Sequence, residues 1–68
     1  MDVRSGEYVQ LRQADGSLLL DRTGTTVTFE IVSVESDTSG THCSLVAEDP
    51  LINALYAGWH PVARLIRT

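Results

Sequence analysis

The sequence predicts one small, mainly β domain, an antiparallel sheet of about five strands that curls on itself, with one short helix near residues 50–57. Apolar and polar residues alternate over several short stretches, which is typical of strands that bury one face. Asp-Gly, Thr-Gly and Ser-Gly pairs separate these stretches and indicate turns. The 68 residues, 43% of them hydrophobic, are enough for a single ordinary core. We therefore expect one domain over residues 7–68, preceded by a flexible lead-in over residues 1–6.

A hairpin is predicted where two alternating stretches flank the pair Asp15-Gly16. Asp-Gly favours a two-residue turn, because both of its residues tolerate positive φ. A turn of this length would place Leu20 opposite Leu11 on the core face. Leu19 would then point to the other face.

The stretch 26–35 is the clearest strand, because it is rich in β-branched residues and lacks proline and glycine. Its apolar residues occupy odd positions up to Ile31 and even positions from Val32 onward. A flat strand with one buried face cannot bury both sets. The change of phase predicts either a β-bulge near Ile31 and Val32 or a bend that lets the two halves serve different walls of the core.

A polar loop is predicted over residues 36–41, where serine, threonine, aspartate and glycine gather. The loop is long enough for a mobile hairpin tip. The next strand is expected over residues 42–48, with Cys43 and Leu45 on its buried face.

A short helix follows, since Asp49 suits the N-cap, Pro50 the first helical position and Gly58 the C-terminal stop. Residues 59–68 are predicted to form a closing strand, because four strands alone would leave exposed edges. A helix that begins at Pro61 is the alternative. It would give an α+β fold with a four-stranded sheet and two C-terminal helices.

The stretch 58–66, Gly-Trp-His-Pro-Val-Ala-Arg-Leu-Ile, is faintly similar to the end of an SH3 domain, where a proline leads into a last apolar strand. The similarity covers only this stretch. It implies a small SH3-like barrel that the last strand closes. The acidic and aromatic loop motifs of ligand-binding SH3 domains are missing, and a helix is predicted where that family has none.

No catalytic, metal or cofactor motif stands out, so neither an enzyme nor a cofactor is expected. His42 and Cys43 are adjacent in a strand and would point to opposite faces, so these two and His60 do not predict a zinc site. Cys43 is expected to be a buried and inert thiol. The glycines form no phosphate-binding loop. A small-molecule or enzymatic role would need a pocket near these residues.

A cytoplasmic location is expected from three features. A single cysteine fits a reducing compartment. Residues 1–6 lack the apolar core of a signal peptide. No stretch approaches the roughly 20 apolar residues that span a bilayer, so no membrane partner is expected.

The charge argues against nucleic acid as the main partner. The net charge is −4, and all five basic residues are dispersed arginines. Binding to a phosphate backbone depends on accumulated positive charge, which this chain lacks. A small nucleic-acid-binding barrel that uses its arginines and aromatic residues is the alternative.

A surface for a protein partner is predicted from Tyr56, Trp59, His60, Arg64 and Arg67, residue types that favour interface hot spots. Trp59 could instead close the core after the helix. We expect a small, acidic, non-catalytic protein-binding module that acts as an accessory, regulatory or inhibitory protein. Homo-oligomer formation through strand edges is a further option.

Overall fold

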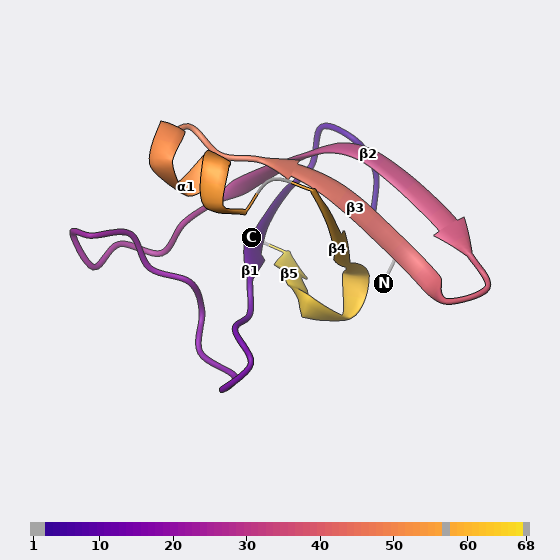
Figure 1. The fold of residues 1–68 in the computed structure, drawn as a ribbon, viewed down its shortest axis with the longest axis horizontal. Coiled ribbons are helices and arrows are strands. Elements are labelled where there is room, and N and C mark those ends of the chain that lie inside the picture. The colour runs from indigo at the N-terminus through magenta and orange to yellow at the C-terminus, as the bar shows by residue number, and fades with distance from the viewer. Residues whose placement is uncertain (1–2, 57, 68) are drawn as a thin grey trace.

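The structure is a computed structural model that describes residues 3–56 and 58–67 (Figure 1). Five antiparallel strands form one sheet in the order β4-β3-β2-β1-β5, which confirms the mainly β class. The elements are β1 (Tyr8–Leu11), β2 (Phe29–Asp37), β3 (Gly40–Val46), α1 (Pro50–Leu55), β4 (Trp59–Pro61), the 3-10 turn η1 (Val62–Arg64) and β5 (Leu65–Arg67). Parts of the predicted lead-in, helix and tail, namely residues 1–2, 57 and 68, lie outside the described residues.

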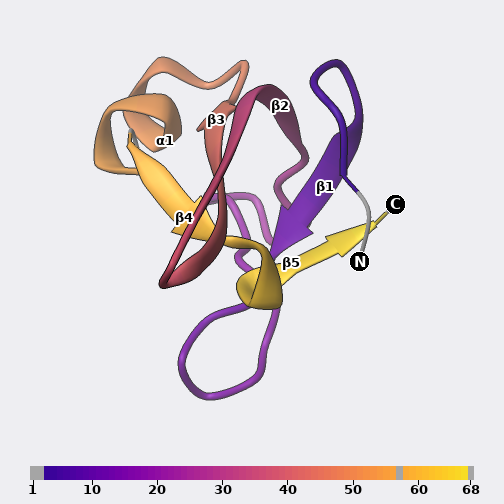
Figure 2. The same ribbon diagram turned by 90° about the vertical axis from the view of Figure 1, so that its right-hand side faces the viewer.

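The sheet is not closed into a barrel, so an open antiparallel sheet is found rather than the barrel, which is the other expected form. β4 pairs with β3, and β5 pairs with β1, which leaves these two strands at opposite ends of the sheet order. Figure 2 shows β3 and β4 on one side and β1 and β5 on the other, with η1 between β4 and β5. Both end strands have only three residues.

A β-bulge in β2 contributes to the curl. Ile31 lies opposite Leu45 and Ser33 lies opposite Ser44, so Val32 is the extra residue. Ile31 is fully buried, whereas Val32 is exposed. The predicted bulge is therefore confirmed, and bulges of this kind increase the local twist of a strand.

The first hairpin differs from the prediction by one residue. The N–H of Gly16 donates to the carbonyl of Gln13 at 3.0 Å, and Gly16 has a φ of 90°. This left-handed glycine belongs to a three-residue loop with a bulge rather than to a two-residue turn. The longer loop places Leu19 opposite Leu11, so Leu19 is buried and Leu20 is exposed. The predicted pairing of Leu20 with Leu11 is therefore wrong.

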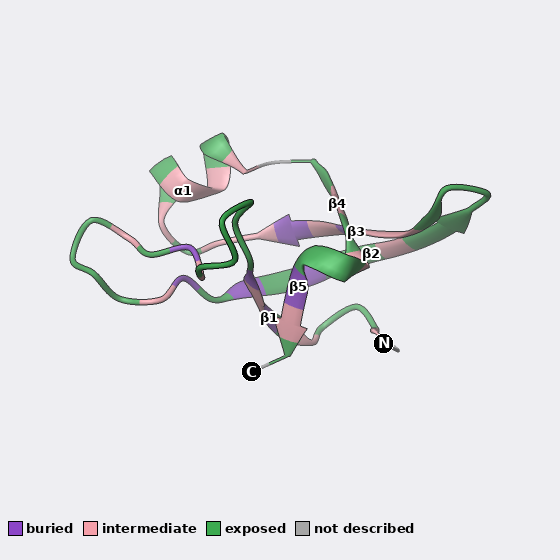
Figure 3. Cartoon of the chain, turned by 90° about the horizontal axis from the view of Figure 1, so that it is seen from below, coloured by how far each residue is buried: buried purple, intermediate pink, exposed green. Residues whose placement is uncertain are grey.

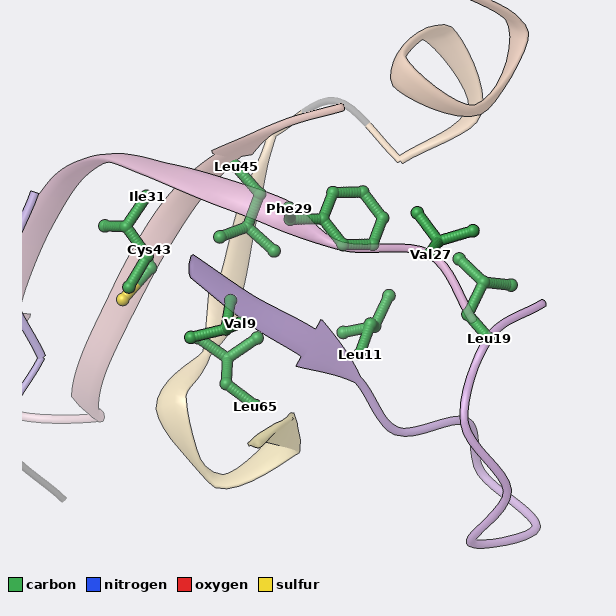
Figure 4. Packing of buried hydrophobic residues seen from close by; sticks show 9 residues of the cluster. All are labelled: Val9, Leu11, Leu19, Val27, Phe29, Ile31, Cys43, Leu45 and Leu65. Carbon is green, nitrogen blue, oxygen red and sulfur yellow. The ribbon is translucent and has the colours of Figure 1, made fainter. Parts of the chain in front are cut away.

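The same loop geometry recurs before β2. The N–H of Gly24 donates to the carbonyl of Asp21 at 3.1 Å, and Gly24 has a φ of 86°. The N–H of Val27 then donates to the carbonyl of Leu19 at 3.0 Å. Leu19 and Val27 consequently lie side by side at one end of the core (Figure 4).

The hairpin of β2 and β3 projects beyond the rest of the sheet (Figure 1). Its strands pair as far as Asp37 and Gly40, which leaves a two-residue turn. The predicted loop over 36–41 is therefore too long. Ser36 and Thr41 are partners in the ladder instead, and their hydroxyl oxygens lie 2.9 Å apart. β2 also begins and ends later than predicted.

Helix α1 begins at the predicted cap. The Oδ1 atom of Asp49 accepts hydrogen bonds from the N–H groups of Leu51 at 2.9 Å and Ile52 at 3.4 Å. The helix has six residues, fewer than predicted. Its Asn53 Oδ1 accepts a 3.0 Å hydrogen bond from the N–H of Ala47, which fixes α1 to the end of β3.

The tail forms two short strands rather than one long strand or a helix. Pro61 ends β4, and η1 then turns the chain from the side of β3 to the side of β1. The N–H of Arg12 donates to the carbonyl of Arg64 at 2.8 Å, directly before β5. The single strand predicted over residues 59–68 is therefore found as two short strands that η1 separates.

One cluster of buried hydrophobic residues forms the core (Figure 4). Its members come from the strands and from the two loops before β2: Val9, Leu11, Leu19, Val27, Phe29, Ile31, Cys43, Leu45 and Leu65. The predicted inward face of β3, with Cys43 and Leu45, is confirmed. Figure 3 shows that burial is concentrated in the middle of the sheet, while the hairpin tip and the turns are exposed.

Candidate binding surfaces

Tyr56 and His60, two of the predicted contact residues, make contacts within the fold. The Tyr56 ring packs edge-on against Phe29, with centroids 6.2 Å apart and an interplanar angle of 68°. The Nε2 atom of His60 donates to the carbonyl oxygen of Tyr56 at 2.8 Å. Both side chains are half-buried, so only part of each is available to a partner.

Trp59 lies on the outer face of β4 with 48% of its surface exposed, so it does not close the core. Its ladder partner is Ser44, whereas the buried Cys43 is the partner of His60. A recess of about 280 Å³ lies beside the Trp59 ring. Its lining residues come from β2, β3, their turn and β4: Glu35, Asp37, Ser39, His42 and Trp59. We call this the Trp59 recess.

The Trp59 recess joins an aromatic ring to a polar rim. Glu35 and His42 are cross-strand partners. The hydroxyl of Ser39 donates to Asp37 at 2.6 Å, and this bond is the main reason that the pKa of Asp37 lies below its usual value. His42 lowers the pKa of Asp37 further through its charge. The rim is therefore anionic at neutral pH.

Arg64 and Arg67 do not line the Trp59 recess. Arg64 is exposed on η1. The Nε atom of Arg67 lies 3.4 Å from a carboxylate oxygen of Glu7, in a partly exposed ion pair. Of the five predicted contact residues, Trp59 lines this recess, whereas the two arginines lie on η1 and β5.

A larger groove of about 610 Å³ lies between the second loop, the centre of the sheet and the start of α1. Its residues are Tyr8, Asp21, Thr26, Val27, Thr28, Glu30, Val46, Ala47, Glu48, Asp49 and Ile52. We call it the acidic groove. Sequence reasoning missed it, because its carboxylates are scattered along the chain and only the fold gathers them. The net negative charge was the one available signal.

Two carboxylates of the acidic groove are held by local hydrogen bonds. Asp21 Oδ1 accepts from the hydroxyl of Thr23 at 2.6 Å and from the N–H of Thr25 at 3.0 Å. These bonds, led by the one from the Thr23 hydroxyl, lower the pKa of Asp21. Asp49 is the helix cap described above. Both side chains therefore have fixed positions on the rim.

Two findings in the described part of the chain concern metal binding and thiol chemistry. No group of three or more His, Cys, Asp or Glu side chains in this part of the chain could hold a metal ion. Cys43 is buried, and burial raises the pKa of its thiol, which opposes formation of the reactive thiolate. No helix among these residues has the length and apolar character needed to cross a membrane.

Comparison with known family models, with curated proteins and with solved structures finds no match to this chain. Function is therefore inferred from the two surfaces alone.

Proposed function

We propose that this chain is a small, non-catalytic protein-binding module that acts as an accessory, regulatory or inhibitory protein and contacts its partner through Trp59. The observation that carries this proposal is the 48% exposure of the one tryptophan on an edge strand. Tryptophan is among the residues most enriched at interface hot spots, because its large flat ring loses much water contact when it is covered.

The surroundings of Trp59 support the same role. Glu35, Asp37 and His42 form a polar rim beside the ring. An aromatic centre with a polar rim is the usual anatomy of a protein interface. The outer edge of β4 adds a short stretch of backbone that a partner strand could extend.

Two finer features belong to the proposal. The first is the similarity of residues 58–66 to the end of an SH3 domain. Pro61 supports it, because this proline precedes η1 and the last strand, β5. The sheet of this chain is nevertheless open. The second is a cytoplasmic location. Cys43 supports it as a free and buried thiol, because the cytoplasm keeps thiols reduced.

The test is capture of partners from extracts of the source cells with the wild-type chain and with Trp59→Ala, followed by quantitative mass spectrometry. A partner that uses this anchor should lose affinity by about 30-fold or more in the variant. Leu55→Ala is the matched control, because Leu55 is also a large exposed apolar residue, with 67% exposure, and lies on α1.

The proposal predicts a protein that is retained by Leu55→Ala and lost by Trp59→Ala, with both variants folded by circular dichroism. Equal retention by both variants would remove Trp59 from the interface. As Trp59 is the only tryptophan, its fluorescence can report directly on binding of the purified partner.

A further inference from the structure

Part of the lining of the acidic groove is apolar, and we call this part its floor. Tyr8, Val27, Val46 and Ile52 contribute aromatic or aliphatic surface. The other lining residues come from the second loop, from the segment around the start of β2 and from the connection of β3 to α1. The volume of about 610 Å³ lies within the usual range for sites that hold a short peptide segment or a molecule of similar size.

The rim of the groove carries carboxylates that form no ion pair with the residues that the structure describes. Asp21, Glu30, Glu48 and Asp49 all line it, and no arginine does. The ion pair found among the described residues joins Arg67 to Glu7, and neither of these residues lines the groove. The local hydrogen bonds of Asp21 and Asp49 reach Oδ1 only. The Oδ2 atom of each carboxylate takes no part in these hydrogen bonds.

The rim is also pre-organised. Asp21 is fixed by the turn that contains Gly24, and Asp49 is fixed as the cap of α1. Asn53 holds α1 against the end of β3, which fixes the connection that carries Glu48 and Asp49. Charged groups that are already in place lose little conformational entropy when a ligand binds.

We propose that the acidic groove binds an extended basic segment of a partner protein, with arginine or lysine side chains on the rim carboxylates and an apolar side chain on the floor. The negative charge of the rim favours the positively charged side chains of arginine and lysine. The apolar floor favours a peptide over a small polyamine, because only a peptide presents apolar side chains between its charges. This inference rests on the proposed protein-binding function but uses a surface other than the Trp59 recess.

The test uses a fluorescein-labelled hexapeptide that alternates arginine and leucine, with binding followed by fluorescence anisotropy against the full chain. Glu30→Gln and Glu48→Gln are the informative variants, since both side chains are exposed and neither accepts a hydrogen bond that holds a turn or cap. Glu35→Gln is the matched control, because it removes the same charge at the Trp59 recess.

Each groove variant should weaken peptide binding about twofold to fivefold, and the double variant by on the order of tenfold, whereas Glu35→Gln should have no effect. An increase from about 50 to about 500 mM sodium chloride should weaken binding as well. Trp59→Ala should leave peptide binding unchanged. The experiment therefore distinguishes a failure of the proposed Trp59 interface from a failure of the proposed peptide site.

Four results would overturn the inference. The first is no binding of the arginine peptide, and the second is equal binding of a matched peptide with glutamine in place of arginine. The third is displacement by spermine at the same concentration as by unlabelled peptide, which would identify a polyamine site. The fourth is self-association of the chain in sedimentation that Glu30→Gln/Glu48→Gln abolishes, which would identify a second copy as the occupant.

Discussion

The backbone N–H of Leu19 donates a 2.9 Å hydrogen bond to the carbonyl oxygen of Leu11, and this bond decides which leucine of the return segment is buried. Leu19 is 6% exposed, whereas Leu20 is 50% exposed. Leu19→Ala should therefore lower the free energy of unfolding by about 2–4 kcal/mol, because it leaves a cavity in the core. Leu20→Ala should lower it by less than about 1 kcal/mol.

Urea denaturation of the two variants checks this prediction. The wild-type slope of the transition should be retained, so that a shift of midpoint reports stability alone. A greater loss in Leu20→Ala than in Leu19→Ala would mean that the hairpin has the two-residue turn and the register that Asp15-Gly16 suggests.

Acid should destabilise the domain through three turn aspartates. Hydrogen bonds from the hydroxyls of Ser17, Thr23 and Ser39 lower the pKa of the carboxylates that accept them. The carboxylates concerned are Asp15, Asp21 and Asp37. A carboxylate whose pKa is lower in the folded state contributes stability above its unfolded pKa and loses that contribution as the pH falls through the folded pKa.

The urea midpoint should therefore be constant from neutral pH to about pH 5 and fall below about pH 4. The triple variant Asp15→Asn, Asp21→Asn, Asp37→Asn keeps turn-forming side chains but removes these titrations. Its midpoint should depend less on pH in the acidic range. An identical acid profile in the variant and the wild type would assign the acid sensitivity to other carboxylates.

Cys43 should react with thiol reagents only when the domain opens. The side chain is 0% exposed, and burial raises the pKa of its thiol. Labelling with a chromogenic disulfide at about pH 8 should be much slower in the native chain than in the unfolded chain. The rate should increase with urea as the opened population increases.

An unfolded sample in concentrated urea provides the reference rate for this labelling. Native labelling at the same rate would place the Cys43 sulfur at the surface. Such a result would contradict its position in the core between β2 and β4.

The sequence predicts most of the elements because each depends on local chemistry. Asp49 and Pro50 predict the start of α1, and the phase change between Ile31 and Val32 predicts the bulge. The register of the first hairpin is not predictable in this way. Asp-Gly also fits a loop in which glycine alone takes positive φ, and the choice between the two turns decides which side chains of the return segment face the core.

The surfaces are less predictable than the elements. The exposed position of Trp59 depends on which face of β4 is outward, and residues 59–61 carry no clear alternation. The acidic groove depends on Asp21, Glu30 and Glu48, which are separated in the chain and come together only because the start of β2 pairs with the end of β3. Long-range assembly of this kind leaves no local pattern.

The pairing of β1 with β5 has a consequence for how this chain acquires its structure. Val9 lies opposite Arg67, and Leu65 fills the core beside β1. The two strands are separated by nearly the whole chain, so the entropy of closing a very long loop must be overcome before their contacts contribute. On the ribosome, the sheet cannot be completed until the last strand has left the exit tunnel. Until then, the edge of β1 that pairs with β5 lacks its partner strand.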